Sequence, residues 1–563
     1  MKKDVAKSCA LAGMVLTVGI SAVLCAHESD VSSVQPTAET WTMPSSDMPL
    51  GPAGSTQRVV TQPVTSGVTY FHIQRGSVSA SDFWTVNIGF YPTRAAAQHD
   101  VSALTAAGFT TRFDPSAGKN LDGTVLGYYL SLGKYPSQAD ATAAAEHIAQ
   151  ATSHKYQPAV RNTALAGNAT TGPWLVNVLA IKPSQTSAAL AVALAGGNDL
   201  GGNGETVSAA ARRLSALAGV NGGFFSNINP FNTPLPARSP VGTTVLDGRL
   251  IATAAGGRSG VMITKTRDGH PKLTLLSRLT TRVTLSDSQG MTTEIKSIDR
   301  PILGTVVNCG APAQSPTTLP AQDHVCTNYN DLVMYDSLYR QDKASNSQVN
   351  AGYKGATYEL IVSAAGTVMS GHTALGHAAP PSGGYVLQGL GKNANWLQQH
   401  AATGTKLMLS THVYSNGHEV SLRPCVSIIE AGPTLITPDL AANAATEGFS
   451  PDITAVDHGD SSGTPNQSWY EGWYVDRNGR TAVGVAADGT ILLVEIDGRQ
   501  PGLSLGTTIP ETAAVMKWLG AASALNLDGG GSSNMVVGGS TVGHPSDASG
   551  ERGVGDTLMI LPD

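Results

Sequence analysis

One acidic residue and three consecutive glycines lie between two apolar runs in the stretch ALNLDGGGSSNMVV, Ala524–Val537. The period of two in a strand puts Leu525 and Leu527 on one face and Asn526 and Asp528 on the other. Glycines remove Cβ atoms and allow positive φ, so that successive N–H groups can converge on an anion. From spacing alone, the stretch is either a tight turn or a site where Asp528 meets an anionic substrate.

Two other segments have the same pattern of a short apolar strand, a polar residue and small residues. AGVNGGFF (Ala218–Phe225) carries Asn221, and SIIEAGPTLI (Ser427–Ile436) carries Glu430. An ordinary turn explains each segment taken alone, because Gly-rich dipeptides are typical of turns.

The anion that fits this pattern best is a phosphate joined to a second chemical group. The chain has no G-x-x-x-x-G-K-[ST] motif, and a nearby carboxylate would repel an isolated phosphate. Arginine is the expected partner of phosphate oxygens, and Arg258 and Arg480 both lie in turns of small residues. The later acids Asp547 and Asp556 can approach Asp528 only through the fold. We therefore predict no metal or cofactor, and leave a divalent ion such as calcium open.

Composition limits the class of protein. The 563 residues predict two or three domains, and 63 glycines with 13% charged residues predict a loop-rich globular protein. A net charge of −6 without basic runs argues against nucleic-acid binding. The oligomeric state is left open.

The N-terminus predicts export. Three lysines precede an apolar run that ends near Ala26, so that residues 1–26 read as a signal peptide, with an uncleaved membrane anchor as the alternative. Residues 27–66 are rich in Ser, Thr, Pro and Gln and predict a flexible leader. A secreted or cell-envelope location follows. In such a compartment, Cys309 and Cys326 are expected to form a disulfide, and Cys425 is expected to be a buried free thiol.

An internal repeat follows the leader. VNIGFYPTRAAA (Val86–Ala97) matches LSLGKYPSQADA (Leu130–Ala141), and each copy predicts a strand, a helix with Thr93 or Ser137 as N-cap, and a second strand. Residues 82–161 resemble the SPOR domain, whose family binds peptidoglycan glycan strands. The resemblance implies a glycan ligand on the exposed sheet face, near Thr85 and Asn87. A βαβ-βαβ domain without such a ligand is the alternative.

The remaining residues, 173–562, predict an α+β domain of mixed, mainly antiparallel sheets. Its two clearest helices are Thr206–Leu217 and Thr508–Gly520, each with a threonine cap, and each leads into one of the polar strand ends. The segments AGVNGGFF, EAGPTLI, GRTAVGVAADGTILLVEIDGR and ALNLDGGGSSNMVVGG resemble the phosphodiester glycosidase family. That family includes an enzyme that removes N-acetylglucosamine from a sugar phosphodiester.

The resemblance implies a hydrolase whose leaving group is a phosphate ester and whose carboxylate faces an oxocarbenium-like sugar. We predict catalytic carboxylates at Asp528 and, second, Glu430. The predicted substrate and phosphate contacts are Asn221, Gly222, Gly223, Arg258, Arg480, Thr481, Gly529, Gly530, Gly531 and Ser532. The alternatives are a non-catalytic envelope protein that binds glycan, and a wall hydrolase of ordinary glycosidic bonds.

Overall fold

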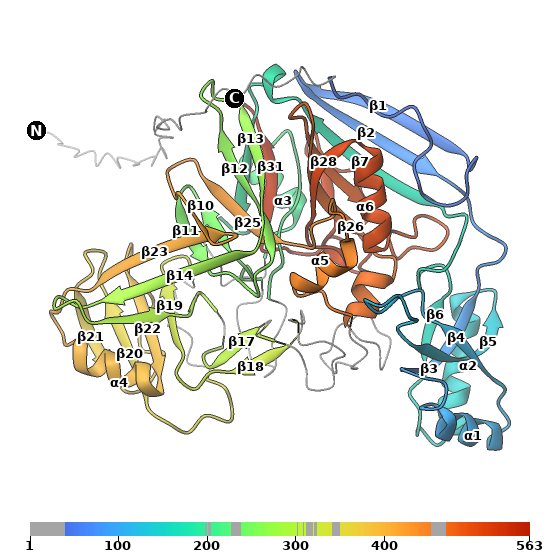
Figure 1. The fold of residues 1–563 in the computed structure, drawn as a ribbon, viewed down its shortest axis with the longest axis horizontal. Coiled ribbons are helices and arrows are strands. Elements are labelled where there is room, and N and C mark those ends of the chain that lie inside the picture. Colours follow the sequence, from blue (N-terminus) through green and yellow to red (C-terminus); the bar gives the residue numbers. More distant parts are fainter. Residues whose placement is uncertain are drawn as a thin grey trace, which may run out of the picture.

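The computed structural model describes residues 40–197, 200, 204–226, 238–300, 302–307, 309–310, 319, 324–339, 349–451 and 469–563. The predicted signal peptide, and with it the alternative of a membrane anchor, lies outside these residues. Within them, no helix is both long and apolar enough to cross a membrane. The fold is α+β, as predicted, with mainly antiparallel sheets and short helices (Figure 1).

A six-stranded sheet forms the centre of the large domain. Its order is β1 (Gln57–Thr65), β2 (Val68–Arg75), β7 (Trp174–Ile181), β27 (Ile491–Ile496), β26 (Arg480–Ala486) and β28 (Ala521–Asn526). The strands β7 and β27 are buried at every position, which explains their nearly continuous apolar sequences. Because β1 and β2 precede the SPOR-like repeat in sequence but pair into this sheet, the repeat is an insertion between two parts of the large domain.

The prediction of a flexible leader is wrong for residues 40–66. Trp41, Met48 and Leu50 are buried in the main core, and β1 pairs with β2 along its length. These few apolar residues are scattered without a helix or strand period, so that their burial depends on contacts with distant segments. The Trp41 indole, for example, donates a 2.6 Å hydrogen bond to the carbonyl oxygen of Leu519. Residues 27–39 lie outside the described part of the chain.

Two five-stranded sheets flank the site described below. One has the order β11 (Arg249–Ala252), β10 (Thr244–Leu246), β25 (Ser427–Ala431), β12 (Ser259–Lys265) and β13 (Pro271–Leu276). The other has the order β30 (Ser540–Thr541), β29 (Met535–Val537), β9 (Ala218–Asn221), β31 (Asp556–Leu561) and β8 (Ala189–Leu194).

The two predicted helices of the large domain are present as α3 (Val207–Leu214) and α6 (Ile509–Trp518). Each has the predicted threonine cap, Thr206 or Thr508, and Thr508 forms a reciprocal capping box with Glu511. Two short helices precede β26 in the chain: α5 (Leu440–Thr446) and the π-helical segment η2 (Tyr470–Val475).

A peripheral lobe extends from the body (Figure 1). It contains two sheets. The four-stranded sheet has the order β15 (Thr292–Ile295), β14 (Leu279–Ser286), β23 (Met408–Ser415) and β24 (His418–Val420). The five-stranded sheet has the order β16 (Ser297–Ile298), β19 (Leu332–Asp336), β22 (Tyr385–Leu390), β20 (Thr357–Val362) and β21 (Val368–His372). Helix α4 (Gly391–His400) packs on β20 and β22.

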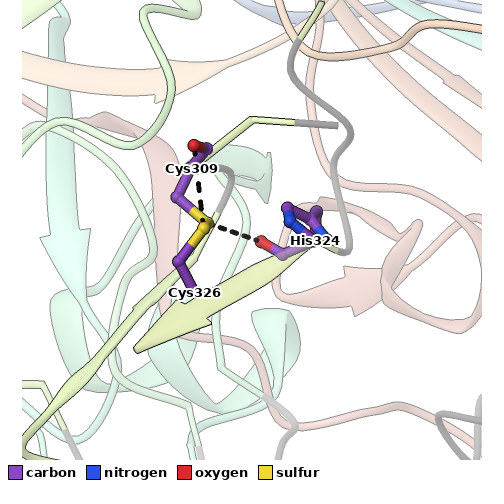
Figure 2. Close-up of a disulfide and its surroundings, with 3 residues drawn as sticks. All are labelled: Cys309, His324 and Cys326. Carbon is purple, nitrogen blue, oxygen red and sulfur yellow. Dashed lines mark hydrogen bonds between the residues drawn. A yellow bond between two sulfur atoms is a disulfide. The ribbon is translucent and has the colours of Figure 1, made fainter. Parts of the chain in front are cut away.

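The predicted disulfide joins Cys309 to Cys326, next to the small hairpin of β17 (Thr305–Val307) and β18 (Val325–Thr327) (Figure 2). The carbonyl oxygen of His324 lies 3.7 Å from the Cys309 sulfur. Among the described residues, Cys309, His324 and Cys326 are the one group of His, Cys, Asp or Glu side chains close enough together to hold a metal ion. The disulfide already uses both of its sulfur atoms. The prediction that Cys425 is buried is wrong, because this residue lies half-buried at a turn.

The SPOR-like domain is a four-stranded antiparallel sheet with two helices on one face. Its order is β4 (Thr111–Pro115), β5 (Tyr128–Tyr135), β3 (Trp84–Tyr91) and β6 (Ala159–Asn162), and its helices are α1 (Gln98–Ala106) and α2 (Gln138–Ala151). Ser137 caps α2 as predicted, whereas Thr93 caps the turn before α1, which begins later than expected.

The predicted exposure of Thr85 and Asn87 is wrong, since both side chains are buried. The Arg112 guanidinium lies across this face and donates a 3.0 Å hydrogen bond to Thr85 Oγ1. Arg161 covers the same face and stacks on Tyr129, 4.1 Å from its ring centroid. The sheet face opposite the helices is therefore covered by arginine side chains and is not a free polar surface.

Candidate functional site

The segments around Asn221 and Asp528, which share a sequence pattern, meet in the structure. Asn221 Nδ2 donates to the backbone oxygen of Asp528 at 2.9 Å, and the Asp528 N–H donates to Gly222 O at 3.0 Å. Thr481 Oγ1 donates to Asn221 Oδ1 at 2.6 Å. The Asn221 and Thr481 side chains are fully buried, and their polar atoms hold the ends of β9, β26 and β28 together. These contacts support a role in positioning Asp528.

Asp556 is a second carboxyl group at this point, and sequence spacing gave no signal for it. It begins β31, beside Gly222 and Gly223, and its Oδ1 accepts a 2.7 Å hydrogen bond from the Gly223 N–H. A Cβ on Gly222 would overlap this carboxyl group, so that the glycine is required by the approach of Asp556.

The two acids have different exposure and different protonation behaviour. Burial, and then the charge of Asp528, raise the pKa of Asp556 to about 7. Burial also raises the pKa of Asp528, while the Ser532 hydroxyl, the Gly529 N–H and nearby arginines oppose this rise. Asp528 is half-buried and Asp556 is 1% exposed, so Asp528 is the acid that a substrate can reach.

Glu430 lies next to this site, but its carboxylate is occupied within the protein. Its Oε2 accepts hydrogen bonds of 2.7 Å from both the N–H and the hydroxyl of Thr243, and its Oε1 accepts from Ala255 N–H at 3.0 Å. The Arg258 Nε lies 3.3 Å from Oε1, and both side chains are fully buried. These contacts favour a structural pair, and a catalytic role for Glu430 stays a prediction.

The three glycines after Asp528 are in close contact with other parts of the protein. A Cβ on Gly529 would lie 2.9 Å from Gly479 O, and one on Gly530 would lie 3.0 Å from the Arg499 guanidinium. A Cβ on Gly531 would overlap Asp547 and Arg552. The absence of side chains on Gly530 and Gly531 thus makes room for charged side chains of the protein itself. The sequence pattern explained these glycines only by a turn or by the approach of a substrate.

Most of the loop N–H groups have partners inside the protein. Gly222 and Gly530 donate to backbone oxygens, and Gly223 and Gly529 donate to the carboxylates of Asp556 and Asp528. A phosphate site at this loop therefore depends mainly on side chains.

Arg480 is the predicted arginine closest to the glycine loop. It is fully buried, its Nη1 would be 3.7 Å from a Cβ on Gly529, and Nη1 has no hydrogen-bond partner among the described residues. Burial and the neighbouring Arg499 lower the pKa of Arg480 to about 9, which leaves the side chain charged at neutral pH. Its remaining donors are held by Thr507 O at 2.8 Å and by Trp473 O at 2.5 Å.

The second predicted arginine, Arg258, belongs to the neighbouring Glu430 pair. It lies over the Phe224 ring at 4.9 Å, while Arg480 lies over the Trp473 ring at 5.0 Å. The two rings are themselves in contact, with centroids 5.8 Å apart. The aromatic contact joins the two arginines into one buried region, and the sequence pattern gave no indication of it.

Three further charged residues surround Asp528. Arg238 and Arg552 act electrostatically on Asp528, and Arg552 forms a 2.7 Å ion pair with Asp547. Arg238 also lies over the Phe225 ring at 4.8 Å. Sequence reasoning missed both arginines because they lie in turns without a distinctive neighbour pattern. Together with Arg480 and Arg499, they make the surroundings of the glycine loop strongly cationic.

Several buried polar atoms at the loop have no hydrogen-bond partner within the described residues. They are Asn526 Oδ1, Ser533 Oγ, Asn534 Oδ1, Asn534 Nδ2 and Arg480 Nη1. Buried polar groups in folded proteins nearly always have partners. Their concentration next to Asp528 is what a site for a polar, anionic ligand requires.

A family model described as "Phosphodiester glycosidase" matches residues 356–561, which include β26, β28 and the glycine loop. Residues 356–561 are therefore a phosphodiester glycosidase family domain. A second model, described as "SPOR domain", matches residues 80–162.

A solved structure from Burkholderia pseudomallei K96243, named "Putative exported protein", is 62% identical to this chain. The match covers 93% of this chain and 100% of that chain, with a TM-score of 0.87. The zebrafish N-acetylglucosamine-1-phosphodiester alpha-N-acetylglucosaminidase catalytic domain matches at 15% identity over 69% of this chain and 78% of that chain. Its TM-score of 0.29 is too low to support a conclusion.

The SPbeta prophage-derived uncharacterized protein YomE of Bacillus subtilis is 40% identical over 81 residues, or 14% of this chain. The match spans only 12% of that relative's length, so the whole relative is not a guide to activity.

Proposed function

We propose that this chain is an exported hydrolase that cleaves the glycosidic bond of sugar 1-phosphodiesters, of the type of N-acetylglucosamine 1-phosphodiester. The match of residues 356–561 to the phosphodiester glycosidase family supports the reaction class. The signal-like residues 1–26 and the name of the Burkholderia relative support export. Cell-wall polymers and exopolysaccharides are the proposed sources of substrate.

The observation that carries the proposal is the half-buried Asp528 surrounded by arginines. When the bond between the anomeric carbon and the phosphate oxygen breaks, positive charge develops on the sugar and negative charge on the phosphate. Asp528 supplies the carboxylate that stabilises the sugar side, and Arg480, with the neighbouring cations, stabilises the leaving phosphate ester. A wall hydrolase of ordinary glycosidic bonds does not require so many arginines.

Asp556 has a positioning role in this proposal. Below its pKa of about 7 it is neutral, so it does not repel the charge on Asp528. Because it is buried behind Gly222, it acts through Asp528 and not on the substrate directly. No step requires a metal, and a chelator control tests this prediction.

The test is release of free sugar from the methyl ester of N-acetylglucosamine 1-phosphate and from a panel of other sugar 1-phosphodiesters. Asp528→Asn is expected to lower kcat/KM by about 10²–10⁴-fold while the protein stays folded. Asp122→Asn is the matched control, since Asp122 bonds Thr124 in an exposed turn of the SPOR-like domain.

If no phosphodiester in the panel is cleaved, the chain is a non-catalytic binding protein and the proposal fails. If glycosidic bonds without phosphate are cleaved as fast as the phosphodiesters, the assignment of the arginines fails. Wild-type activity in Asp528→Asn would leave Glu430 as the next predicted carboxylate to substitute.

A further inference from the structure

The SPOR-like domain is in direct contact with the segment that holds the arginines of the candidate site. The contact centres on Glu471, which is fully buried in η2. Its Oε1 accepts 2.7 Å hydrogen bonds from the hydroxyls of Ser116 and Tyr129, and both donors belong to the SPOR-like domain. A charged group buried at an interface is costly without such donors.

The contact is close along the backbone as well. A Cβ on Gly118 would lie 2.8 Å from Val475 and 2.9 Å from Glu471 Oε2, so that the Ser116–Gly118 turn lies directly on η2. Arg477, just after η2, donates to the carbonyl oxygens of Ala164 and Asn168 at 2.5 and 2.7 Å. The connection that follows the SPOR-like domain is therefore fixed to the same segment.

The carbonyl groups of this segment position Arg480. Trp473 O, inside η2, and Asp476 O, directly after it, accept from Arg480 Nη2 at 2.5 and 3.1 Å. With Nη2 held on one side, Nη1 lies toward Gly529.

The same segment also positions Arg499 through Asn478. Asn478 Nδ2 donates to Gly472 O at 2.9 Å and to Asp476 O at 3.1 Å, and Asn478 Oδ1 accepts from Arg499 Nε at 2.5 Å. The Arg499 guanidinium is packed against Gly530. Two of the arginines at the glycine loop, Arg480 and Arg499, thus depend on the conformation of η2.

We propose that Glu471 is a positioning residue through which the docked SPOR-like domain holds Arg480 and Arg499 in the arrangement that binds phosphate. The proposal rests on the proposed function for its phosphate, but the coupling between the domains can be measured without catalysis. In this view, the inserted domain is part of the phosphate site and not only an attachment module.

The test uses the full chain with Tyr129→Phe combined with Ser116→Ala, which removes both donors to Glu471. Two readouts are measured, the hydrogen exchange of backbone amides over residues 469–480 and the affinity for inorganic phosphate. We expect faster exchange over this segment, and roughly tenfold weaker phosphate binding if one arginine contact is lost. Among substrates that turn over, KM is expected to rise more than kcat falls.

The matched control is Tyr91→Phe. Its hydroxyl donates at 2.7 Å to Asp100 of helix α1, so that its hydrogen bond lies within the SPOR-like domain and not at η2. Glu471→Ala is expected to resemble the double variant. Glu471→Gln keeps an acceptor oxygen for the two hydroxyls and is expected to retain most of the phosphate affinity.

Unchanged exchange over residues 469–480 in the double variant would overturn the proposal, as would faster exchange with unchanged phosphate affinity. The same holds if Tyr91→Phe gives effects as large as the double variant. If the wild-type chain binds no phosphate, the proposed function fails, and the exchange data alone decide whether the domain positions η2.

Discussion

At the scale of single residues, protonation separates the two acids of the candidate site. Asp556 is buried and its carboxyl group accepts a hydrogen bond from the Gly223 N–H, whereas Asp528 is half-buried among cations. Burial disfavours a charged carboxylate, and a nearby cation favours it. Asp556 is therefore mainly neutral below pH 7, while the cations around Asp528 favour its charged form.

The raised pKa of Asp556 predicts how stability depends on pH. Its folded pKa of about 7 exceeds the ordinary value of 3.8, so its contribution to stability is present below pH 3.8 and is lost as pH rises through 7. Asp556→Asn cannot ionise and should not show this loss. We expect the variant to gain stability relative to wild type between pH 5 and pH 8, measured by urea unfolding at each pH. A constant difference across this range would contradict the assignment.

At the scale of elements, the glycine loop joins a strand end to charged side chains from distant segments. Gly531 lies against Asp547 and Arg552, and Gly530 has a φ of +63° beneath Arg499. A Cβ on Gly531 would displace the Arg552 ion pair, and overlap of this kind costs about 1–3 kcal/mol in a packed site.

Gly531→Ala is therefore expected to lower stability by about 1–3 kcal/mol and to raise KM for a sugar phosphodiester, since it moves a cation near Asp528. Urea unfolding and steady-state kinetics measure the two effects. Gly538→Ala is the comparison, because it strains a residue with φ of +59° but meets no atom within 4 Å. It should cost about 1 kcal/mol and leave KM unchanged. Equal KM values in the two variants would show that Arg552 does not contribute to binding.

At the scale of the whole molecule, the SPOR-like domain is inserted between β2 and β7 of the central sheet and docks back on the large domain. We propose that it also binds peptidoglycan glycan strands, as the family model suggests. The sheet face around Thr85 and Asn87 is covered, so binding there requires another face or partial opening of this contact.

The full chain is expected to co-sediment with insoluble peptidoglycan and to be released by soluble glycan strands. Added salt should release little protein, since the net charge is only −6 and the ligand is expected to bind through hydrogen bonds. Cellulose serves as the control polysaccharide. Equal sedimentation with cellulose and peptidoglycan, or none with either, would contradict specific glycan binding.

The sequence by itself determined many of the elements and which segments carry the candidate residues. The periodicity of the repeat predicted the strands and helices of the inserted domain, and the threonine caps located α3 and α6. The common pattern of a buried strand that ends in a polar residue and glycines assigned Asn221 and Asp528 to one predicted site, and the structure places the two residues in contact. These features are local, because they follow from side-chain period, capping and the backbone freedom of glycine.

Only the tertiary structure decided which charged groups surround Asp528 and which polar residues are already occupied. Asp556, Arg238, Arg499 and Arg552 reach the site from separate segments, while Glu430 is enclosed by Thr243, Ala255 and Arg258. The burial of Trp41 and of Thr85 likewise depends on segments distant in sequence. Burial and electrostatic interaction are properties of the space around a residue, and neighbours in that space are not encoded in local spacing.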